Sequence, residues 1–331
     1  MENVAQAALN KTELLRESGP ATATPDVQPT TQEKRRQAKR QRLTPEERKE
    51  RADALHSRLQ SSIADLANAE RWADFIHAAR GFGTTWSFNN LMLITAQAAE
   101  RGFTPSLVKT SRAWRELGRT IKAGEKALYI LEPVKYRLSA EEAEKAGKAG
   151  YDSDGNPRRV MRGARPSPRF DISQTEGEQV PASVDAATLV TDEDFAAVWE
   201  AVADQIRQAG YNVAGGPPGQ VDSYTDPETR EVWVCDTLDD VPAIMAALKE
   251  LAHILLGHLD DPVDYRQHRG PIDAEAKSVA FIVAGALGIE TATTDVLGWW
   301  NGLTDFMPEA AERITATAQQ ILKAAEKPAL S

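Results

Sequence analysis

Apolar residues recur at the three- and four-residue spacing of an amphipathic helix through much of the chain. The first such segment contains Leu55, Leu59 and Ile63 and continues toward residue 82. Its start is predicted at Thr44, because a threonine followed three residues later by Glu47 can form a capping box. The same spacing predicts further helices over residues 88–100, 111–117, 139–149, 192–210, 241–259, 273–287 and 308–325.

Short runs rich in β-branched and aromatic residues predict strands between these helices. In the first half of the chain they cover residues 119–122 and 127–131 around a tight turn, with a return strand at residues 170–172. In the second half, Tyr224 and residues 231–235 predict a small antiparallel hairpin. Helices combined with a few antiparallel strands are typical of an α+β protein.

The chain is long enough for two folded domains and a tail, since one domain usually takes about 100–200 residues. Residues 1–43 lack apolar periodicity and predict a disordered basic tail. Residues 44–182 are expected to form an α+β domain with an inserted connector at residues 138–168. Residues 183–331 are expected to form a mostly helical domain with a small antiparallel sheet.

Charge is distributed unevenly along the chain. The net charge of −10 divides into +3 for residues 1–52, +4 for residues 53–137 and −17 for residues 138–331. A polyanion is therefore attracted to the front of the chain and repelled by the back. A basic run from Lys34 to Arg42 is either an arm for nucleic acid or a solvated approach to the first helix, and the sequence leaves both open.

Three features bear on the cellular compartment. Cys235 is the single cysteine, so the chain has no internal disulfide, which fits a reducing environment. The longest apolar stretch, residues 279–289, is shorter than the roughly 18 residues that a membrane helix needs. The first eleven residues lack the apolar core of a secretory signal. We therefore expect a cytoplasmic protein without a membrane partner.

Aromatic, basic and amide side chains alternate in the front domain in a way that suits unpaired nucleic acid. Aromatic rings can stack on bases, each stack contributing about 1–3 kcal/mol, while cations and amides can contact phosphates and base edges. The alternative is that the aromatic residues belong to the core, and residue chemistry alone favours that alternative. The candidate nucleic-acid-binding residues are Trp86, Phe88, Asn89, Asn90, Arg112, Trp114, Arg115, Arg119, Lys122 and Lys126.

The order of three motifs in this region is informative. "WSFNNLMLITAQ", "SRAWRELGRTIKAGEKALYILEPV" and "RFDISQTEGEQVP" follow one another, and this arrangement resembles the N-terminal domain of ArdC-type antirestriction proteins over roughly residues 53–182. Those proteins are carried on plasmids and phages. The resemblance implies binding of single-stranded DNA and protection of incoming DNA from restriction. The segment between Arg137 and Pro168 departs from the tighter pattern of the family.

A second motif lies in the predicted helix at residues 241–259. Zinc peptidases carry His-Glu-x-x-His on a helix, where the two histidines share one face, bind the metal, and leave the Glu as general base. In this chain Glu250 and His253 stand in register, but Lys249 occupies the position of the first histidine. An ammonium group only donates hydrogen bonds, so Lys249 cannot ligate zinc unless it loses its proton.

The surrounding sequence resembles the ImmA/IrrE-like metallopeptidases that form the second half of ArdC-type proteins. "ELAHILLGH" is followed by "DAEAKSVAFIVAGALGIET", and together they cover roughly residues 190–300. The family implies a zinc site of His, His and Glu with a second Glu as base. Glu250 matches the base, while His253 and Glu275 match two of the three ligands.

We expect that this site holds no zinc. Two carboxylates without a metal would each resist ionisation beside the other, and a lysine amine can supply the missing positive charge. We therefore hypothesise that Lys249 pairs with Glu275 or Glu250. The alternative is a rearranged zinc site in which His258 or Asp260 joins His253 and Glu275. His258 fits it poorly, because a five-residue step is about 140° around a helix.

The combined prediction is a single-stranded-DNA-binding antirestriction-like protein of a mobile element whose metallopeptidase-like half is inactive. Its expected partner is single-stranded DNA, with restriction or repressor proteins as further candidates. One alternative is an active zinc metallopeptidase that cleaves a repressor or a restriction-related protein. Another is a protein-interaction module that does not bind DNA.

Overall fold

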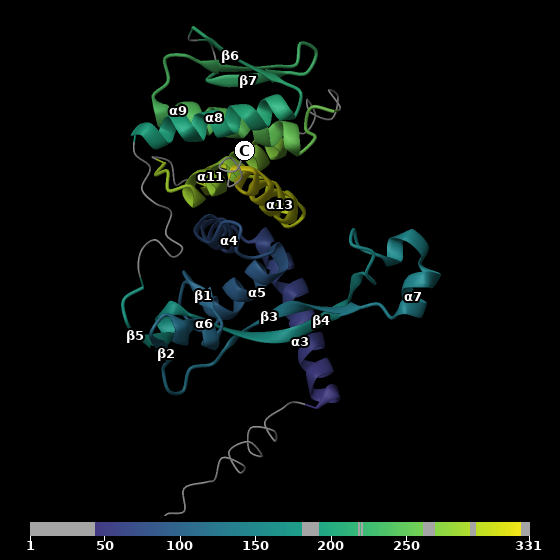
Figure 1. Ribbon diagram of the computed structural model, residues 1–331. Coiled ribbons are helices and arrows are strands. Elements are labelled where there is room, and N and C mark those ends of the chain that lie inside the picture. The colour runs from purple at the N-terminus through teal and green to yellow at the C-terminus, as the bar shows by residue number, and fades with distance from the viewer. Residues whose placement is uncertain are drawn as a thin grey trace, which may run out of the picture. The chain divides into compact units, whose positions relative to one another are not determined.

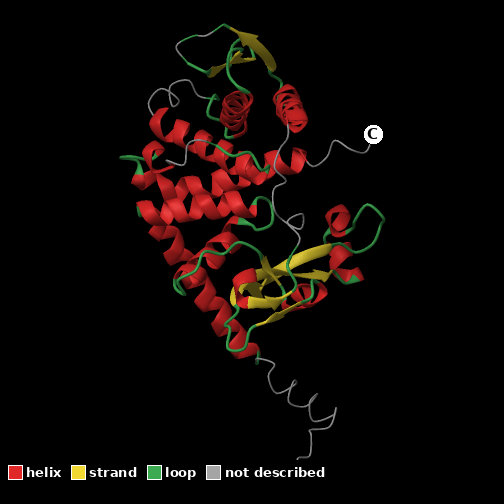
Figure 2. Cartoon of the chain, turned by 90° about the vertical axis from the view of Figure 1, so that its left-hand side faces the viewer, coloured by secondary structure: helices red, strands yellow, loops and turns green. Residues whose placement is uncertain are grey.

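The computed structural model describes residues 44–180, 192–217, 219, 221–260, 269–291 and 296–325. The predicted basic tail, including the run from Lys34 to Arg42, lies outside these residues. Residues 48–331 form one compact unit. The structure is mixed helix and sheet, so the predicted α+β class is confirmed (Figures 1 and 2).

The N-terminal half of the chain contains five helices and five strands among its described residues. The helices are α3 (Pro45–Ala64), α4 (Ala69–Phe82), α5 (Phe88–Ala99), α6 (Ser111–Glu116) and α7 (Ala140–Lys145). The strands are β1 (Val108–Lys109), β2 (Arg119–Ile121), β3 (Leu128–Arg137), β4 (Arg159–Asp171) and β5 (Thr175–Gly177). Short 3-10 turns are η1 (Asp65–Ala67), η2 (Gly147–Gly150) and η3 (Ile172–Gln174).

The C-terminal half is mostly helical, as predicted, with one small sheet. Its elements are α8 (Asp192–Gln208), β6 (Asn212–Gly216), β7 (Ser223–Asp226), β8 (Glu231–Cys235), α9 (Asp240–Leu255), α11 (Arg269–Ala286), α12 (Val296–Trp299), η5 (Thr304–Phe306) and α13 (Met307–Ala325). The predicted hairpin is confirmed, because β7 and β8 pair antiparallel. Strand β6, which the sequence pattern did not indicate, pairs parallel to β8 and makes the sheet mixed.

The predicted start of the first helix is confirmed in detail. The amide of Glu47 donates to Thr44 Oγ1 at 3.1 Å, and the amide of Thr44 donates to the Glu47 carboxylate at 2.7 Å. These reciprocal bonds satisfy backbone donors that the helix itself leaves unpaired. The helix therefore begins at Pro45, one residue after its cap.

Strands β3 and β4 form a long antiparallel ribbon where the sequence suggested an inserted connector. The ladder runs from Leu128 opposite Arg169 to Arg137 opposite Arg159, with a register shift between Pro133 and Lys135. The last part of the predicted connector, residues 159–168, belongs to β4, while residues 138–158, with α7 and η2, lie outside the ladder (Figure 1). The return strand predicted at residues 170–172 is thus the last part of a much longer strand.

Helix α5 holds the free edge of β3. The side-chain amide of Asn90 both accepts from the backbone N–H of Leu131, at 2.9 Å, and donates to its carbonyl, at 3.2 Å. Gln97, two helical turns later, makes the same pair of bonds with Tyr129, at 3.0 and 2.8 Å. An exposed strand edge is a row of unpaired donors and acceptors, so these two amides take the place of a neighbouring strand.

Strand β2 pairs with β5 rather than with β3, which differs from the predicted hairpin. The chain turns back after Asp171, whose carboxylate accepts from the amide of Ser173, while the Gln174 side chain reaches back to the amide of Asp171. This turn brings residues 175–177 alongside β2. Gly177 is required there, because a Cβ at this position would lie 2.4 Å from the carbonyl oxygen of Gly118.

The buried core is continuous from α4 to the C-terminal helices. Trp72 of α4 is fully buried and meets Trp300 edge-on, with ring centroids 4.6 Å apart. Arg80 lies over the ring of Phe281 and donates to the carbonyl of Ile289 at 3.2 Å. Gly285 of α11 makes room for Arg80, since a Cβ would come within 1.9 Å of its Nε. The division at residues 182 and 183 stays a prediction.

Among the residues that the structure describes, no helix is both long and apolar enough to cross a membrane.

Candidate functional site

Helix α9 places the three motif residues at the interior of the C-terminal half. Its apolar side faces the core through residues such as Leu248 and Leu251, which are fully buried. Glu250 and His253, three residues apart and therefore on one face, are each 3% exposed. Lys249, four residues before His253 and therefore also beside it on the helix, is partly exposed.

The carboxylate of Glu250 is saturated with donors. Ser223 of β7 donates to its Oε1 at 2.7 Å and Thr225 donates to its Oε2 at 2.8 Å. Lys249 Nζ lies 2.9 Å from the same Oε1, so the hypothesised pairing of Lys249 with Glu250 is confirmed. A buried carboxylate needs such partners to stay charged. The two hydroxyls of β7 could not be assigned to this site from the sequence, because they lie 25 and 27 residues before Glu250.

His258 lies at the site, contrary to the expectation from helical spacing. Helix α9 ends at Leu255, and Gly257 adopts a left-handed conformation with φ of 71°. The amide of His258 then donates to the carbonyl of His253, and the two imidazole Nδ1 atoms come to 3.1 Å. The 140° argument failed because it assumed that the helix continues to residue 259.

Glu275 of α11 is paired with an arginine that the sequence analysis missed. Both Nε and Nη2 of Arg313, on α13, donate to its carboxylate, and His258 Nε2 lies 3.4 Å from Oε2. Burial by itself would raise the pKa of Glu275, but hydrogen bonds from His258 and Arg313 together outweigh it and hold this pKa below the usual glutamate range. Arg313 thus supplies positive charge beside the carboxylate that the sequence resemblance assigned as a zinc ligand.

The arrangement does not fit a zinc ion. The first ligand position holds Lys249, and Glu275 is held by the two-pronged guanidinium of Arg313. Burial lowers the pKa of His253 to about 4, so this imidazole is neutral at pH 7, which is the form that can ligate a metal, but its Nδ1 is already in contact with His258. Within the described part of the chain, no three His, Cys, Asp or Glu side chains are arranged to hold a metal ion.

Replacing Arg313 with leucine is expected to lower the free energy of unfolding by about 2 kcal/mol. Loss of one partner of a buried pair costs about 3–5 kcal/mol, and we discount that range because the Arg313 side chain is 54% exposed. Urea denaturation at pH 7 measures the loss. Adding Glu275→Gln to the same chain is expected to recover most of it, because the buried charge is then gone; no recovery would contradict the pairing.

The structure corrects the predicted base-stacking role of two front-domain aromatics. Trp114 is fully buried and its indole N–H donates to the carbonyl of Phe170 at 2.8 Å. Phe88 is 7% exposed and meets Phe75 edge-on. A ring enclosed in this way has no face left for a base, so the core interpretation holds for both.

Two further candidates are used inside the protein. Asn90 clamps the edge of β3, so its amide is not available to a base. Trp86 is half-buried against the core, and its carbonyl accepts from Gln319. The guanidinium of Arg169 lies 5.9 Å from the centroid of the Trp86 ring.

Most of the predicted cations lie at the surface but already have partners. Arg112 pairs with Glu116 at 2.8 Å, Arg115 donates to the carbonyl of Ser111, and Lys122 donates to that of Ser173. Arg119, which is half-buried, donates to Thr175, Gly177 and Glu178. Asn89 and Lys126 are exposed, and their side chains make no hydrogen bond or ion pair with the described residues.

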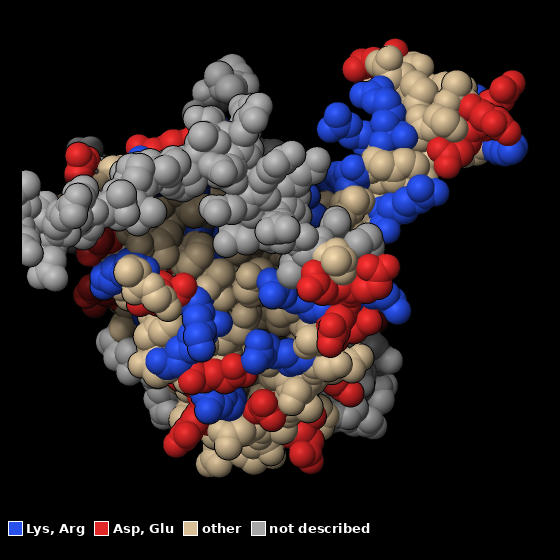
Figure 3. All heavy atoms as spheres, turned by 90° about the horizontal axis from the view of Figure 1, so that it is seen from below, with Lys and Arg blue, Asp and Glu red and all other residues tan. Residues whose placement is uncertain are grey.

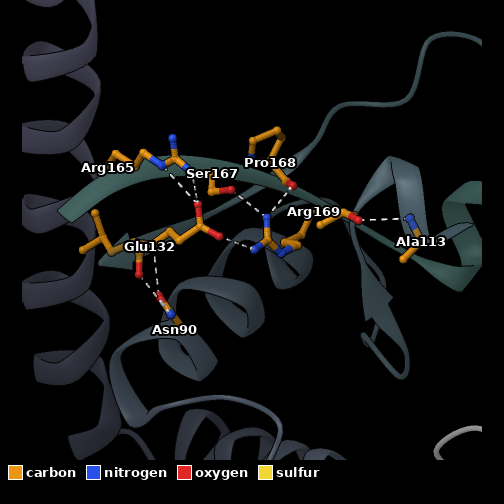
Figure 4. A network of polar contacts seen from close by, with 9 residues as sticks. Asn90, Ala113, Glu132, Arg165, Ser167, Pro168 and Arg169 are labelled. Atoms are coloured by element: carbon orange, nitrogen blue, oxygen red, sulfur yellow. Dashed lines mark hydrogen bonds and ion pairs between the residues drawn. The ribbon is translucent and has the colours of Figure 1, made fainter. Parts of the chain in front are cut away.

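A second polar network lies in the half of the β3–β4 ribbon that contains Leu128 and Arg169, and the sequence analysis did not predict it. Glu132 accepts from Arg165 at 2.8 and 3.1 Å and from Arg169 at 3.3 Å, as Figure 4 shows. The bond from Arg165 is the main reason that the pKa of Glu132 is lowered. Arg169 also donates to Ser167 and to the carbonyl of Pro168. The pairing of β3 with β4 creates this network, and a pattern read along one segment does not reveal it.

Comparisons with known proteins give one family and two solved structures. Residues 65–165 match the family model of the N-terminal domain of the anti-restriction factor ArdC. The metal-free crystal structure of the antirestriction ArdC protein from plasmid R388 is 16% identical, covering 73% of this chain and 85% of that chain, with a TM-score of 0.43. The Mn(II)-bound structure is 14% identical, covering 82% and 98%, with a TM-score of 0.47. No curated protein matches the chain.

Proposed function

Because residues 65–165 match the family model of the N-terminal domain of ArdC, we propose that this protein is an antirestriction protein of a mobile element that binds single-stranded DNA. The family match is the observation that carries this proposal. It covers residues 86–126, which contain all ten of the predicted nucleic-acid-binding residues. The resemblance of the three sequence motifs supports the same assignment.

The proposed contact surface rests on exposed polar groups rather than on enclosed rings. The side chains of Asn89 and Lys126 have no partner among the described residues, while Arg112 and Arg115 are exposed on α6 and held only by weak surface contacts. Surface ion pairs contribute about 0–1 kcal/mol and exchange readily for a phosphate. Such groups support binding to the backbone of a strand more than recognition of its bases.

We propose further that the metallopeptidase-like half does not act through zinc. Its motif glutamate is occupied by Ser223, Thr225 and Lys249, and Glu275 is occupied by Arg313. A general base must accept a proton from a metal-bound water, and Glu250 has no such role in this arrangement. The half then serves as a scaffold or a docking surface for a restriction or repressor protein.

The proposal predicts that the protein binds single strands and raises the transfer of unmodified DNA into a restricting host. Fluorescence anisotropy with labelled oligo-dT, at low and moderate salt, measures the first. Transfer of an unmodified plasmid into restricting and non-restricting recipients, with and without the protein, measures the second. When the protein is present, we expect the transfer frequency into the restricting recipient to approach the transfer frequency into the non-restricting recipient.

A matched pair of variants locates the single-strand contact. Lys126→Ala removes a cation without an internal partner and is expected to reduce the salt dependence of oligo-dT binding by about 0.7 in slope, the value of one phosphate contact. Arg112→Ala removes a cation that is already paired with Glu116, so we expect it to change the salt slope of oligo-dT binding less than Lys126→Ala does. Absence of oligo-dT binding by the wild-type protein would contradict the proposal and favour an interaction module without DNA binding.

The active-metallopeptidase alternative makes a different prediction for the same assay. If a repressor or restriction subunit is cleaved, protection depends on metal and disappears when the protein is treated with a chelator. If the proposal holds, protein treated with a chelator binds oligo-dT as the untreated protein does. The comparison separates the two functions without altering any residue of the site.

A further inference from the structure

The β3–β4 ribbon carries an uneven distribution of charge. Its two strands contain six Lys and Arg residues and only two acidic ones, Glu132 and Asp171. In the half of the ribbon that contains Leu128 and Arg169, Glu132 pairs with both Arg165 and Arg169 and offsets one of their two charges. Figure 3 shows Lys and Arg gathered along this part of the molecule, with Asp and Glu collected toward its end.

In the other half, three cations share one face of the ribbon. Arg137 lies directly opposite Arg159, and Lys135 lies directly opposite Met161. Side chains directly opposite each other in an antiparallel pair project to the same side, as do residues two apart along a strand. Lys135, Arg137, Arg159 and Met161 therefore form one surface, the cationic face.

The cations of this face lack acidic partners among the residues that the structure describes. Lys135, Arg137 and Arg159 are all exposed, and none of them forms an ion pair with a described residue. Like charges placed directly opposite each other destabilise a sheet. The ribbon therefore keeps a costly arrangement that a polyanion would relieve.

The other face of the ribbon is arranged differently. Tyr136 lies opposite Val160, and the guanidinium of Arg162 covers the Tyr136 ring at 4.3 Å from its centroid. Arg162 is also 3.8 Å from Glu142 of α7. This face has its charge neutralised and its aromatic ring covered, so the unpaired charge is confined to the cationic face.

We propose that the cationic face binds duplex DNA. The major groove admits a two-stranded β-ribbon, and basic side chains on it contact phosphates. Met161, 70% exposed, is the apolar group on this face and is suited to contact with a thymine methyl. The acidic side chains of α7, Glu141, Glu142 and Glu144, would repel the backbone and favour contact along the middle of the ribbon.

This inference extends the proposed function to a second form of DNA, and its test keeps the two apart. The variant Lys135→Gln, Arg137→Gln, Arg159→Gln is titrated against a labelled duplex and against labelled oligo-dT at several salt concentrations. Loss of three phosphate contacts is expected to reduce the salt slope of duplex binding by about 2.7. Oligo-dT binding is expected to change far less and reports separately on the proposed single-strand function.

Three controls keep the result interpretable. A variant that removes three exposed cations away from the ribbon, Lys49→Gln, Arg207→Gln, Lys323→Gln, has the same net charge and is expected to retain the duplex slope. The double variant Arg137→Lys, Arg159→Lys keeps the positive charge of the face and is expected to retain most of the salt slope of duplex binding. Thermal unfolding of the triple ribbon variant is expected to match or exceed that of the wild type, because the opposed arginines are gone.

Several outcomes would overturn the inference. One is duplex binding that is unchanged in the ribbon variant while oligo-dT binding is normal, which leaves the proposed function intact. Another is an equal loss in the charge-matched control, which would assign binding to net charge alone. A third is binding to phosphatidylserine vesicles, lost in the ribbon variant, without duplex binding by the wild type, which would identify a lipid surface as the ligand.

Discussion

Replacing Trp72 with alanine is expected to lower the free energy of unfolding by about 3–5 kcal/mol, the range for removal of a large aromatic from a core. Trp72 is fully buried on α4 and contacts Phe75 at 5.5 Å and Trp300 at 4.6 Å between ring centroids. Its ring thus joins the N-terminal half to helices near the C-terminus. Urea denaturation followed by far-UV circular dichroism measures the loss, which we expect in one cooperative transition.

The matched control is Trp72→Phe. The indole Nε1 of Trp72 is buried without a hydrogen-bond partner among the described residues, so phenylalanine keeps an aromatic ring and removes an unsatisfied donor. We expect a loss below about 1.5 kcal/mol, as for other conservative core replacements. Trp300→Phe should cost more, because it breaks the bond from Trp300 to Ser278 Oγ.

The same experiment tests the predicted division into two domains. If the Trp72→Ala protein unfolds in two transitions and only one of them shifts, residues 44–182 and 183–331 fold independently. A single shifted transition would instead indicate that the shared core makes the described chain one cooperative unit. The contact of Arg80 with Phe281 and Ile289 argues for the second result.

Local patterns predicted most of the helices because each carries its own periodicity and end signals, but the first predicted helix is in fact two, α3 and α4, since Asn68 caps the start of α4. The Thr44 and Glu47 capping box is one example, and Gly83, with a φ of 52° after Phe82, is another. The ribbon was not predicted because β4 alternates arginine, proline and small residues, and its apolar content is low. Its stability comes from pairing with β3, whose opposite edge is held by Asn90 and Gln97.

In the candidate site, too, contacts between residues that are close in sequence could be predicted, and contacts between distant residues could not. Lys249 and Glu250 are adjacent in sequence, so their pairing followed from the motif itself. Arg313 is 38 residues from Glu275, and nothing in its surroundings on α13 marks it as a partner. His258 was predicted to lie away from the site because the helix was expected to continue past Gly257. The backbone turns at this glycine instead. Sequence spacing describes a helix face well only as far as the helix extends.

Restoring the missing ligand together with removal of its competitor is expected to create zinc binding. We expect the wild-type protein, purified without added zinc, to contain no stoichiometric metal. Lys249→His supplies a second imidazole four residues from His253 on the same face. Arg313→Leu releases the carboxylate of Glu275 and removes a positive charge from the site. Isothermal titration should show that the double variant binds zinc with a dissociation constant at least about 100-fold lower than that of the wild-type protein. Residues that only orient a metal ligand already change metal affinity by about 10–100-fold.

The single variants show which obstacle dominates. Lys249→His alone leaves Glu275 paired with Arg313 and is expected to bind zinc weakly, while Arg313→Leu alone lacks the first ligand and is expected to bind none. Adding Glu275→Gln to the double variant removes the third ligand and should weaken binding again, with circular dichroism confirming that each chain is folded. Stoichiometric zinc in the wild-type protein would contradict the proposed inactivity and revive the metallopeptidase alternative. Because His258 is 3.1 Å from His253 and 3.4 Å from Glu275, His258→Ala would then show whether the ion uses the rearranged ligand set.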